Sequence, residues 1–185
     1  MRKIAIISSS VRQNRTSHRL AEFVKEYIES NNIGSAEILD LKEYNFPLFD
    51  ERLMFMKDPS EKVLDYVERF TKADAIIILS PVYNQSFPAA LKNAIDLLYS
   101  EWRRKVVGLI TATSSKNPGI NTYFQLENIL LRLGAVVTPT KLTAVEIGSL
   151  FDEEGRPIDE NKLNRQVGGL INDLIWMVDG LVEEK

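Results

Sequence analysis

The sequence predicts an α/β protein whose parallel β-sheet is covered by helices on both faces. Three observations lead to this class: short runs of branched apolar residues, helical segments with one apolar stripe, and regular alternation between the two along the chain. Alternating strands and helices form βαβ units, which build parallel sheets with right-handed crossovers. With 185 residues, a single domain covering residues 1–185 is expected, and the chain can bury a sizeable core.

The first βα unit occupies the start of the chain. Residues 3–8 are an apolar run and are expected to form a buried strand, followed by a polar loop over residues 9–15. Thr16 or Ser17 can cap the helix that comes next. Gly34 lies just beyond the end of this helix, as is typical of helix termini.

The second unit is less regular. Residues 36–41 form a shorter, less apolar strand, which is expected near a sheet edge. Residues 42–57 are irregular but rich in apolar side chains, so they should pack down or cover a partner subunit. Asp58 is expected to cap the next helix, with Pro59 in its first turn and Glu61 completing a capping box. The apolar stripe of that helix consists of Val63, Leu64, Val67 and Phe70.

The third and fourth units contain the most apolar strands. Residues 74–79 are short and β-branched, which favours a central buried strand over a membrane span. A polar and aromatic turn at residues 80–88 leads into an amphipathic helix over residues 89–98. The fourth strand is expected at residues 105–112, and the polar loop 113–119 follows it.

The last unit completes the sheet. A helix begins near Asn121, a fifth strand lies within residues 135–145 with an interruption at Pro139, and a long final helix begins near Asp159. Five strands suit the flavodoxin-like order 2-1-3-4-5, a three-layer sandwich, better than the six-stranded dinucleotide-binding fold. In this order the second strand lies on one side of the first strand, and the third to fifth strands lie on its other side. The switch point of the strand order is therefore between the first and third strands. Three polar loops should therefore converge at one edge of the sheet.

Composition and net charge argue against several classes of function. The net charge is −3, so nothing in it favours nucleic acid or an anionic membrane surface. The absence of cysteine excludes disulfides and thiolate chemistry and fits the cytoplasm. The start of the chain does not have the pattern of a signal peptide, and no run reaches the length of a membrane span. The single histidine, His18, lacks partners at metal-ligand spacing, so no metal site is expected.

The loop at residues 8–17 has the character of an anion site. Its hydroxyls, together with Arg12 and Arg15, precede a helix N-terminus, where free N–H groups and the helix dipole attract phosphate. The loop has neither the P-loop spacing nor G-x-G-x-x-G, which argues against a nucleotide triphosphate or a Rossmann-type dinucleotide. The alternative is an ordinary solvated connection that is rich in serine.

The two other loops suit a planar ring. Pro81 stiffens the turn, and Tyr83 and Asn84 stand beside backbone groups that can address the rim of a ring. The alternative is a plain strand-to-helix connection in which Tyr83 only packs. Lys116 and Asn117 add polar groups at the neighbouring strand end, although that loop alone is generic.

Nearly the whole chain resembles the NAD(P)H-dependent FMN reductase family, which includes azoreductase-, quinone reductase- and chromate reductase-type proteins. Residues 9–21 are similar to the family pattern G-S-x-R-x-x-S-x-N-x-x-L-A, and residues 81–96 are similar to P-E-Y-N-x-S-x-P-G-x-L-K-N-A-I-D. The second match is the longer and more specific one. The chain departs from the usual residues at Ser9, Arg15, Ser17, Val82 and Ala89.

The resemblance implies that FMN is the cofactor, with NADPH or NADH as co-substrate and a small-molecule electron acceptor such as FMN, a quinone or an azo compound. It implies no catalytic side chain, because the flavin carries the chemistry. The residues that it assigns to the FMN phosphate are Ser10, Arg12, Arg15, Thr16 and Ser17, with Ser9 in the same loop. The residues that it assigns to the ring are Pro81, Val82, Tyr83 and Asn84, and on the other side of the ring's edge Thr113, Ser114, Ser115 and Lys116.

Two further expectations concern assembly and alternatives. The final helix is apolar on more than one stripe, which together with the resemblance predicts a homodimer or homotetramer. A flavodoxin-like electron carrier is one alternative function, although the first loop does not have the T/S-x-T-G-x-T spacing of flavodoxins. A regulatory protein without reductase turnover, with or without flavin, is another.

Overall fold

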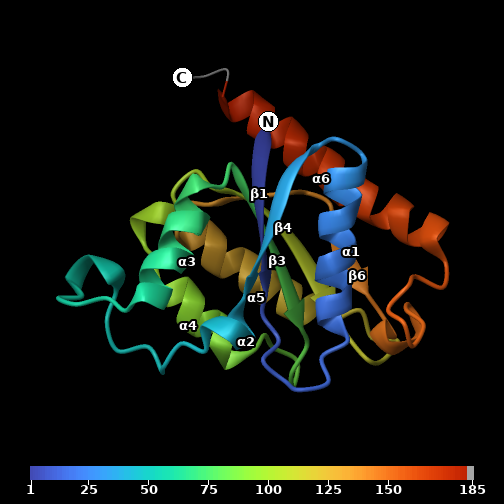
Figure 1. The fold of residues 1–185 in the computed structure, drawn as a ribbon, viewed down its shortest axis with the longest axis horizontal. Helices are drawn as coiled ribbons and strands as arrows, with labels where there is room; N and C mark the ends of the chain where they lie inside the picture. The colour runs from blue at the N-terminus through green and yellow to red at the C-terminus, as the bar shows by residue number, and fades with distance from the viewer. Residues whose placement is uncertain (183–185) are drawn as a thin grey trace.

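A computed structural model describes residues 1–182 and consists of three layers, with a parallel sheet between two layers of helices (Figure 1). The strands are β1 Arg2–Ser8, β2 Gly34–Asp40, β3 Ala75–Pro81, β4 Val106–Ala112, β5 Val136–Val137 and β6 Leu142–Ala144. Their order is β2-β1-β3-β4-β5, with β6 also paired to β4. The predicted flavodoxin-like order is thus confirmed.

The helices divide between the two faces of the sheet. They are α1 Ser17–Ser30, α2 Leu41–Tyr44, α3 Glu61–Lys72, α4 Ala89–Leu97, α5 Ile120–Arg132 and α6 Glu160–Val182. Side chains from α1 and α6 form one apolar core with the sheet, and side chains from α3, α4 and α5 form the other. Because both faces of β1, β3 and β4 are covered, these strands are almost continuously buried, as parallel central strands are.

The fifth strand is interrupted, as the sequence predicted. Val137 pairs with Val107 and Leu142 pairs with Ile110, so residues 138–141 lie opposite only two residues of β4. The extra residues form a bulge that contains Pro139, which has no N–H to donate to the sheet.

Two local predictions around α3 are wrong. Ser60, and not Asp58, caps the helix, since its hydroxyl accepts the N–H of Val63 at 3.4 Å. Tyr66 takes the core position that was expected for Leu64, which is half exposed. Val63, Tyr66 and Phe70 lie on one stripe, and Leu64 falls on the neighbouring face.

The irregular stretch at residues 42–57 contains two short elements that the sequence did not indicate. One is α2, where the Asp40 side chain accepts the N–H of Lys42, and the other is a 3₁₀ turn at Leu53–Phe55. The segment around this turn projects from the α3 and α4 side of the molecule (Figure 1). Within residues 1–182, no helix combines the length and the apolar character needed to cross a membrane.

Candidate functional site

Three loops meet at the carboxyl edge of the sheet. They follow β1, β3 and β4, which are neighbours, and the loops after β1 and β3 lie together at the lower end of the molecule in Figure 1. In an open α/β sheet, this edge beside the change of strand order is where ligands bind. The N-terminus and the described end of α6 lie at the opposite edge (Figure 1).

The first loop, at residues 9–16, is joined directly to the second. The Ser10 hydroxyl lies 2.9 Å from the Tyr83 hydroxyl, within hydrogen-bond distance. Ser9 is fully buried, and both its N–H and its hydroxyl donate to the carbonyl of Leu79, at 3.2 and 2.9 Å. Ser9 therefore joins the loop to β3, and Ser10 reaches toward the ring-binding loop predicted from the sequence.

The two arginines of this loop differ in their contacts. Arg12 is exposed and forms no hydrogen bond or ion pair within residues 1–182. Arg15 forms two hydrogen bonds to the carboxylate of Asp40, and its Nη1 also donates to the carbonyl of Ser10 at 2.9 Å. Arg12 is therefore the arginine whose charge is available to a ligand.

Asp40 is the residue that sequence reasoning missed here. Burial acts to raise the pKa of its carboxyl group, but the hydrogen bonds from Arg15 and the Lys42 N–H outweigh burial and leave the pKa below its usual value. Its position as the last residue of β2 was the available signal, because β2 ends at the same edge of the sheet as β1.

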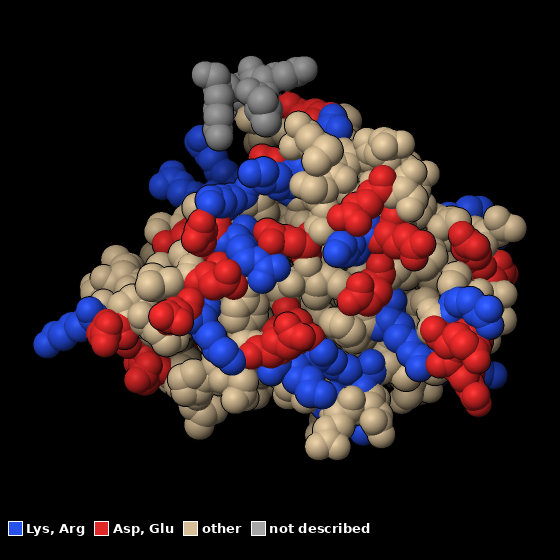
Figure 2. All heavy atoms as spheres, in the orientation of Figure 1, with Lys and Arg blue, Asp and Glu red and all other residues tan. Residues whose placement is uncertain are grey.

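The start of α1 can accept an anion. Thr16 occupies the N-cap position, and its side chain makes no capping hydrogen bond to the first N–H groups of the helix. Such N–H groups attract phosphate. Ser17 is buried in the first turn, and His18 Nδ1 lies 2.9 Å from the hydroxyl of Ser8. Lys and Arg side chains gather along part of the lower edge of the molecule (Figure 2).

The second loop is a tight two-residue turn. Tyr83 and Ser86 exchange backbone hydrogen bonds, with Tyr83 N–H to Ser86 O at 2.7 Å and Ser86 N–H to Tyr83 O at 3.0 Å. Asn84 and Gln85 between them have left-handed φ angles of 50° and 66°, as both central residues of a type I′ turn do. Pro81 is buried at the end of β3. The turn therefore presents Tyr83 and Asn84 in a fixed backbone geometry.

The second and third loops enclose a small pocket of about 200 Å³. Its lining includes predicted site residues from both loops, among them Val82, Asn84, Thr113 and Ser115. Ser114 also lines it, whereas Lys116 is exposed outside the lining. The hydroxyls of Thr113 and Ser115 lie 3.1 Å apart, and Ser115 Oγ accepts the N–H of Asn117 at 3.2 Å.

Gly119 shapes the apolar wall of this pocket and was not predicted as a site residue. Its φ angle is +65°, and a Cβ atom at this position would lie 2.5 Å from Cγ2 of Val82. A glycine at the end of the loop was visible in the sequence, but its contact with Val82 depends on β3 and β4 being neighbours. The two loops can touch here only because this position has no side chain.

The arrangement fits a phosphorylated ligand that carries a flat ring. One end offers uncapped helix N–H groups, the Ser10 hydroxyl and the charge of Arg12. The other end offers an apolar wall at Val82 beside hydroxyl and amide groups. The structure thus brings together residues from all three loops that were predicted to bind the cofactor.

Comparison with known proteins agrees with this geometry. The family model described as NADPH-dependent FMN reductase matches residues 2–148. An NAD(P)H-dependent FMN reductase of Saccharomyces cerevisiae is 28% identical over 161 residues, which cover 80% of this chain and 83% of the yeast protein. An FMN-dependent NADPH-azoreductase of Staphylococcus aureus is 30% identical over 160 residues, covering 81% of this chain and 80% of the relative.

A solved structure supports the fold. The flavoenzyme NAD(P)H:(acceptor) oxidoreductase FerB from Paracoccus denitrificans superposes with a TM-score of 0.79 at 23% identity, covering 96% of this chain and 97% of that one. The resemblance inferred from residues 9–21 and 81–96 is confirmed by the family model, which contains both segments. The chain belongs to the NADPH-dependent FMN reductase family and is an FMN-dependent oxidoreductase.

Proposed function

We propose that this chain binds FMN across the three loops and reduces small-molecule acceptors, such as free FMN, quinones or azo compounds, with NADPH or NADH as the electron donor. The observation that carries the proposal is the 2.9 Å contact between the hydroxyls of Ser10 and Tyr83. It joins the loop suited to phosphate with the loop suited to the ring. A single ligand of the length of FMN can then span both.

The phosphate end is formed by the first loop. The uncapped N–H groups at Thr16 and Ser17, the Ser10 hydroxyl and the Arg12 guanidinium are the donors for the phosphate oxygens. Arg12 has no competing carboxylate partner within residues 1–182, so its charge is fully available to the phosphate. Arg15 already uses three of its five N–H groups on Asp40 and the Ser10 carbonyl.

The ring end is formed by the second and third loops. When bound, FMN supplies the redox chemistry, accepting hydride from the nicotinamide and passing electrons to the acceptor. Val82 offers an apolar surface to the ring, and the turn at Tyr83 and Asn84 orients it. The hydroxyls of Thr113 and Ser115 provide polar groups for its edge. The chain thus contributes position and hydrogen bonds, and no side chain acts as a nucleophile.

Anaerobic mixing of the FMN-loaded protein with NADPH, and separately with NADH, tests this function. We expect loss of the visible flavin absorbance, and its return when a quinone or an azo dye is added. An electron carrier without reductase turnover would bind FMN without rapid bleaching by either nicotinamide. A regulatory relative that lost the cofactor would not bind FMN at all, so the experiment separates the three functions.

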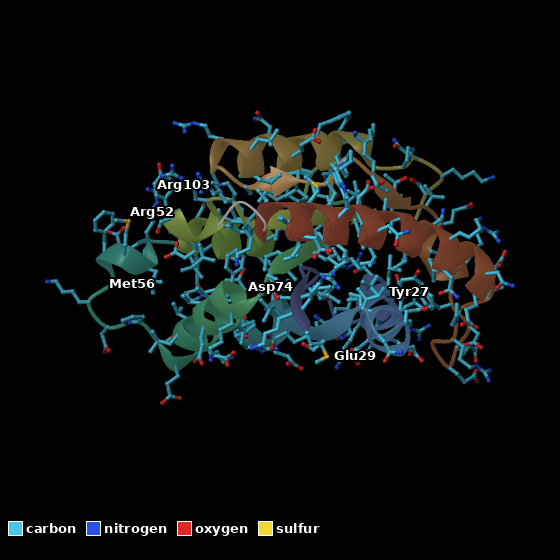
Figure 3. All side chains as sticks on the ribbon, turned by 90° about the horizontal axis from the view of Figure 1, so that it is seen from above. Tyr27, Glu29, Arg52, Met56, Asp74 and Arg103 are labelled. Atoms are coloured by element: carbon cyan, nitrogen blue, oxygen red, sulfur yellow. The ribbon has the colours of Figure 1, made fainter. Side chains whose placement is uncertain are left out.

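We propose that residues 1–185 act as one domain in the cytoplasm and assemble as a homodimer or homotetramer. Exposed apolar side chains support the assembly, since Leu48, Met54 and Phe55 are 82%, 63% and 60% exposed. Leu48 and Phe55 line a cavity of about 370 Å³ under the segment around Leu53–Phe55, on the side of the molecule where Arg52 and Met56 lie in Figure 3. Exposed apolar groups gathered in this way are typical of interfaces.

Sedimentation velocity at several protein concentrations tests the assembly. We expect the wild-type protein to sediment as a dimer or larger, and Phe55→Glu to shift it toward the monomer, because a charge in an apolar interface loses its hydration. Ile158→Glu is the matched control, since Ile158 is 67% exposed and lies outside the projecting segment. A wild-type monomer at every concentration would contradict the proposal.

A further inference from the structure

Arg15 lies in the loop that is predicted to bind the phosphate, but its hydrogen bonds go to the Ser10 carbonyl and the Asp40 carboxylate. These contacts argue against a direct role in binding the phosphate. We propose that Arg15 and Asp40 form a brace that holds the first loop in its binding shape, so that Arg15 acts on FMN through the Ser10 carbonyl and not through its own contact with the phosphate. This inference rests on the proposed FMN site. It assigns Arg15 and Asp40 as positioning residues.

The first step is the geometry of Arg15. Its guanidinium forms two hydrogen bonds with the Asp40 carboxylate, and Nη1 donates to the Ser10 carbonyl at 2.9 Å. A guanidinium is a rigid planar fork, so these contacts fix the direction of the Ser10 carbonyl. The Ser10 side chain, which reaches Tyr83, is thereby held on the site side of the loop.

The second step is the anchoring of Asp40. It is the last residue of β2, paired in register with Ser8 of β1, so its backbone is part of the rigid sheet. One of its oxygens also accepts the N–H of Lys42 at 2.9 Å as the cap of α2. The brace therefore connects the loop after β1 to the end of β2.

The third step is charge and burial. The side chains of Arg15 and Asp40 are only 12% and 6% exposed, so the ion pair lies below the surface of the loop. Because the carboxylate neutralises the guanidinium, Arg15 adds little net attraction for phosphate while the pair is intact. His18 is a further titratable group beside the pair: its Nδ1 is 3.8 Å from the Asp40 carboxylate, and its Nε2 is 3.3 Å from Glu22.

The two roles for Arg15 predict opposite results for Asp40→Asn. If Arg15 braces the loop, removal of the carboxylate weakens FMN binding, and we expect the dissociation constant to rise about tenfold. If Arg15 were a direct phosphate ligand, the same change would release its charge toward the phosphate and strengthen binding. The sign of the change in affinity therefore decides between the two roles.

The experiment measures FMN and riboflavin binding to apoprotein by quenching of flavin fluorescence. Riboflavin has the same ring without the phosphate, so a displaced phosphate loop lowers FMN affinity and leaves riboflavin affinity unchanged. An equal loss for both ligands would show a general structural defect and overturn the brace. Glu22→Gln is the control for the lost negative charge nearby, and we expect FMN affinity within about twofold of wild type.

A second variant keeps the test decisive if Asp40→Asn does not fold, as judged by circular dichroism. Asp40→Glu preserves the charge but moves the carboxylate by one methylene, so the brace predicts weaker FMN binding and the direct role predicts no change. Unchanged or tighter FMN binding by the folded variant would overturn the inference. If the wild-type apoprotein itself binds no FMN, the proposed function fails, and the role of the brace fails with it.

Discussion

Replacing Gly119 with alanine is expected to lower the free energy of unfolding by about 2–4 kcal/mol and to weaken FMN binding, a large effect for the addition of one methyl group. Two costs add at this position. The left-handed φ angle of +65° is unfavourable for a residue with a side chain, and the new Cβ atom would lie 2.5 Å from Val82 Cγ2. Val82 is short and branched, so relief of the contact requires movement of the loop backbone.

Chemical denaturation of the apoprotein measures the loss of stability, and FMN titration measures the effect on the site. Gly148→Ala is the matched control, since a Cβ atom there meets no atom of the described residues within 4 Å. We expect this control to change stability by less than about 0.5 kcal/mol. Adding Val82→Ala to Gly119→Ala should recover part of the lost stability, because it removes the clashing methyl group and leaves only the cost of the φ angle. Equal stability of the Gly119 and Gly148 variants would contradict the prediction.

Arg12→Ala is expected to raise the FMN dissociation constant about 10- to 100-fold while the fold remains intact. Arg12 is exposed and has no partner within residues 1–182, so its removal costs little stability. Its charge is nevertheless the positive charge of the first loop that is unpaired in the described part of the chain, since Arg15 is held by Asp40. Loss of a charged hydrogen bond to phosphate accounts for the size of the effect.

Fluorescence titration with FMN and with riboflavin checks this prediction. Riboflavin affinity should not change, because the contact that is lost involves the phosphate alone. Arg132→Ala is the matched control, as it removes the same charge from the last residue of α5, at the opposite edge of the sheet from the site. An unchanged FMN affinity for Arg12→Ala would place the phosphate elsewhere on the chain.

The strand order and the meeting of the loops were predictable from the sequence. Apolar runs at residues 3–8 and 74–79 mark strands that are buried on both faces, because only such strands lack a polar alternation. Chain connectivity then restricts a five-stranded sheet of βα units to few orders. The same reasoning places the ends of β1, β3 and β4 at one edge, where Ser10 meets Tyr83.

The details around α3 were not predictable in the same way. Residues 58–61 contain two side chains of the kind that cap helices, Asp58 and Ser60, and local preference alone does not choose between them. Tyr66 enters the core in place of Leu64 because α3 is rotated to pack beside Tyr44 and Phe46, whose rings lie 5.3 Å from that of Tyr66. This rotation is set by partners far away in the sequence.

The sequence by itself determined the class of fold, the residues that reach the ligand edge and, through two motifs, the family. Those properties depend on the periodicity of apolar residues and on the spacing of motif residues, and both can be read directly from the sequence. Only the tertiary structure decided how the charges of the first loop are divided, with Arg15 paired to Asp40 and Arg12 without an ion-pair partner among residues 1–182. It also decided that Gly119 must lack a side chain. Both facts arise from contacts between separate βα units. The energy of such contacts depends on the distance between residues that are far apart in the sequence, and a local sequence pattern does not determine that distance.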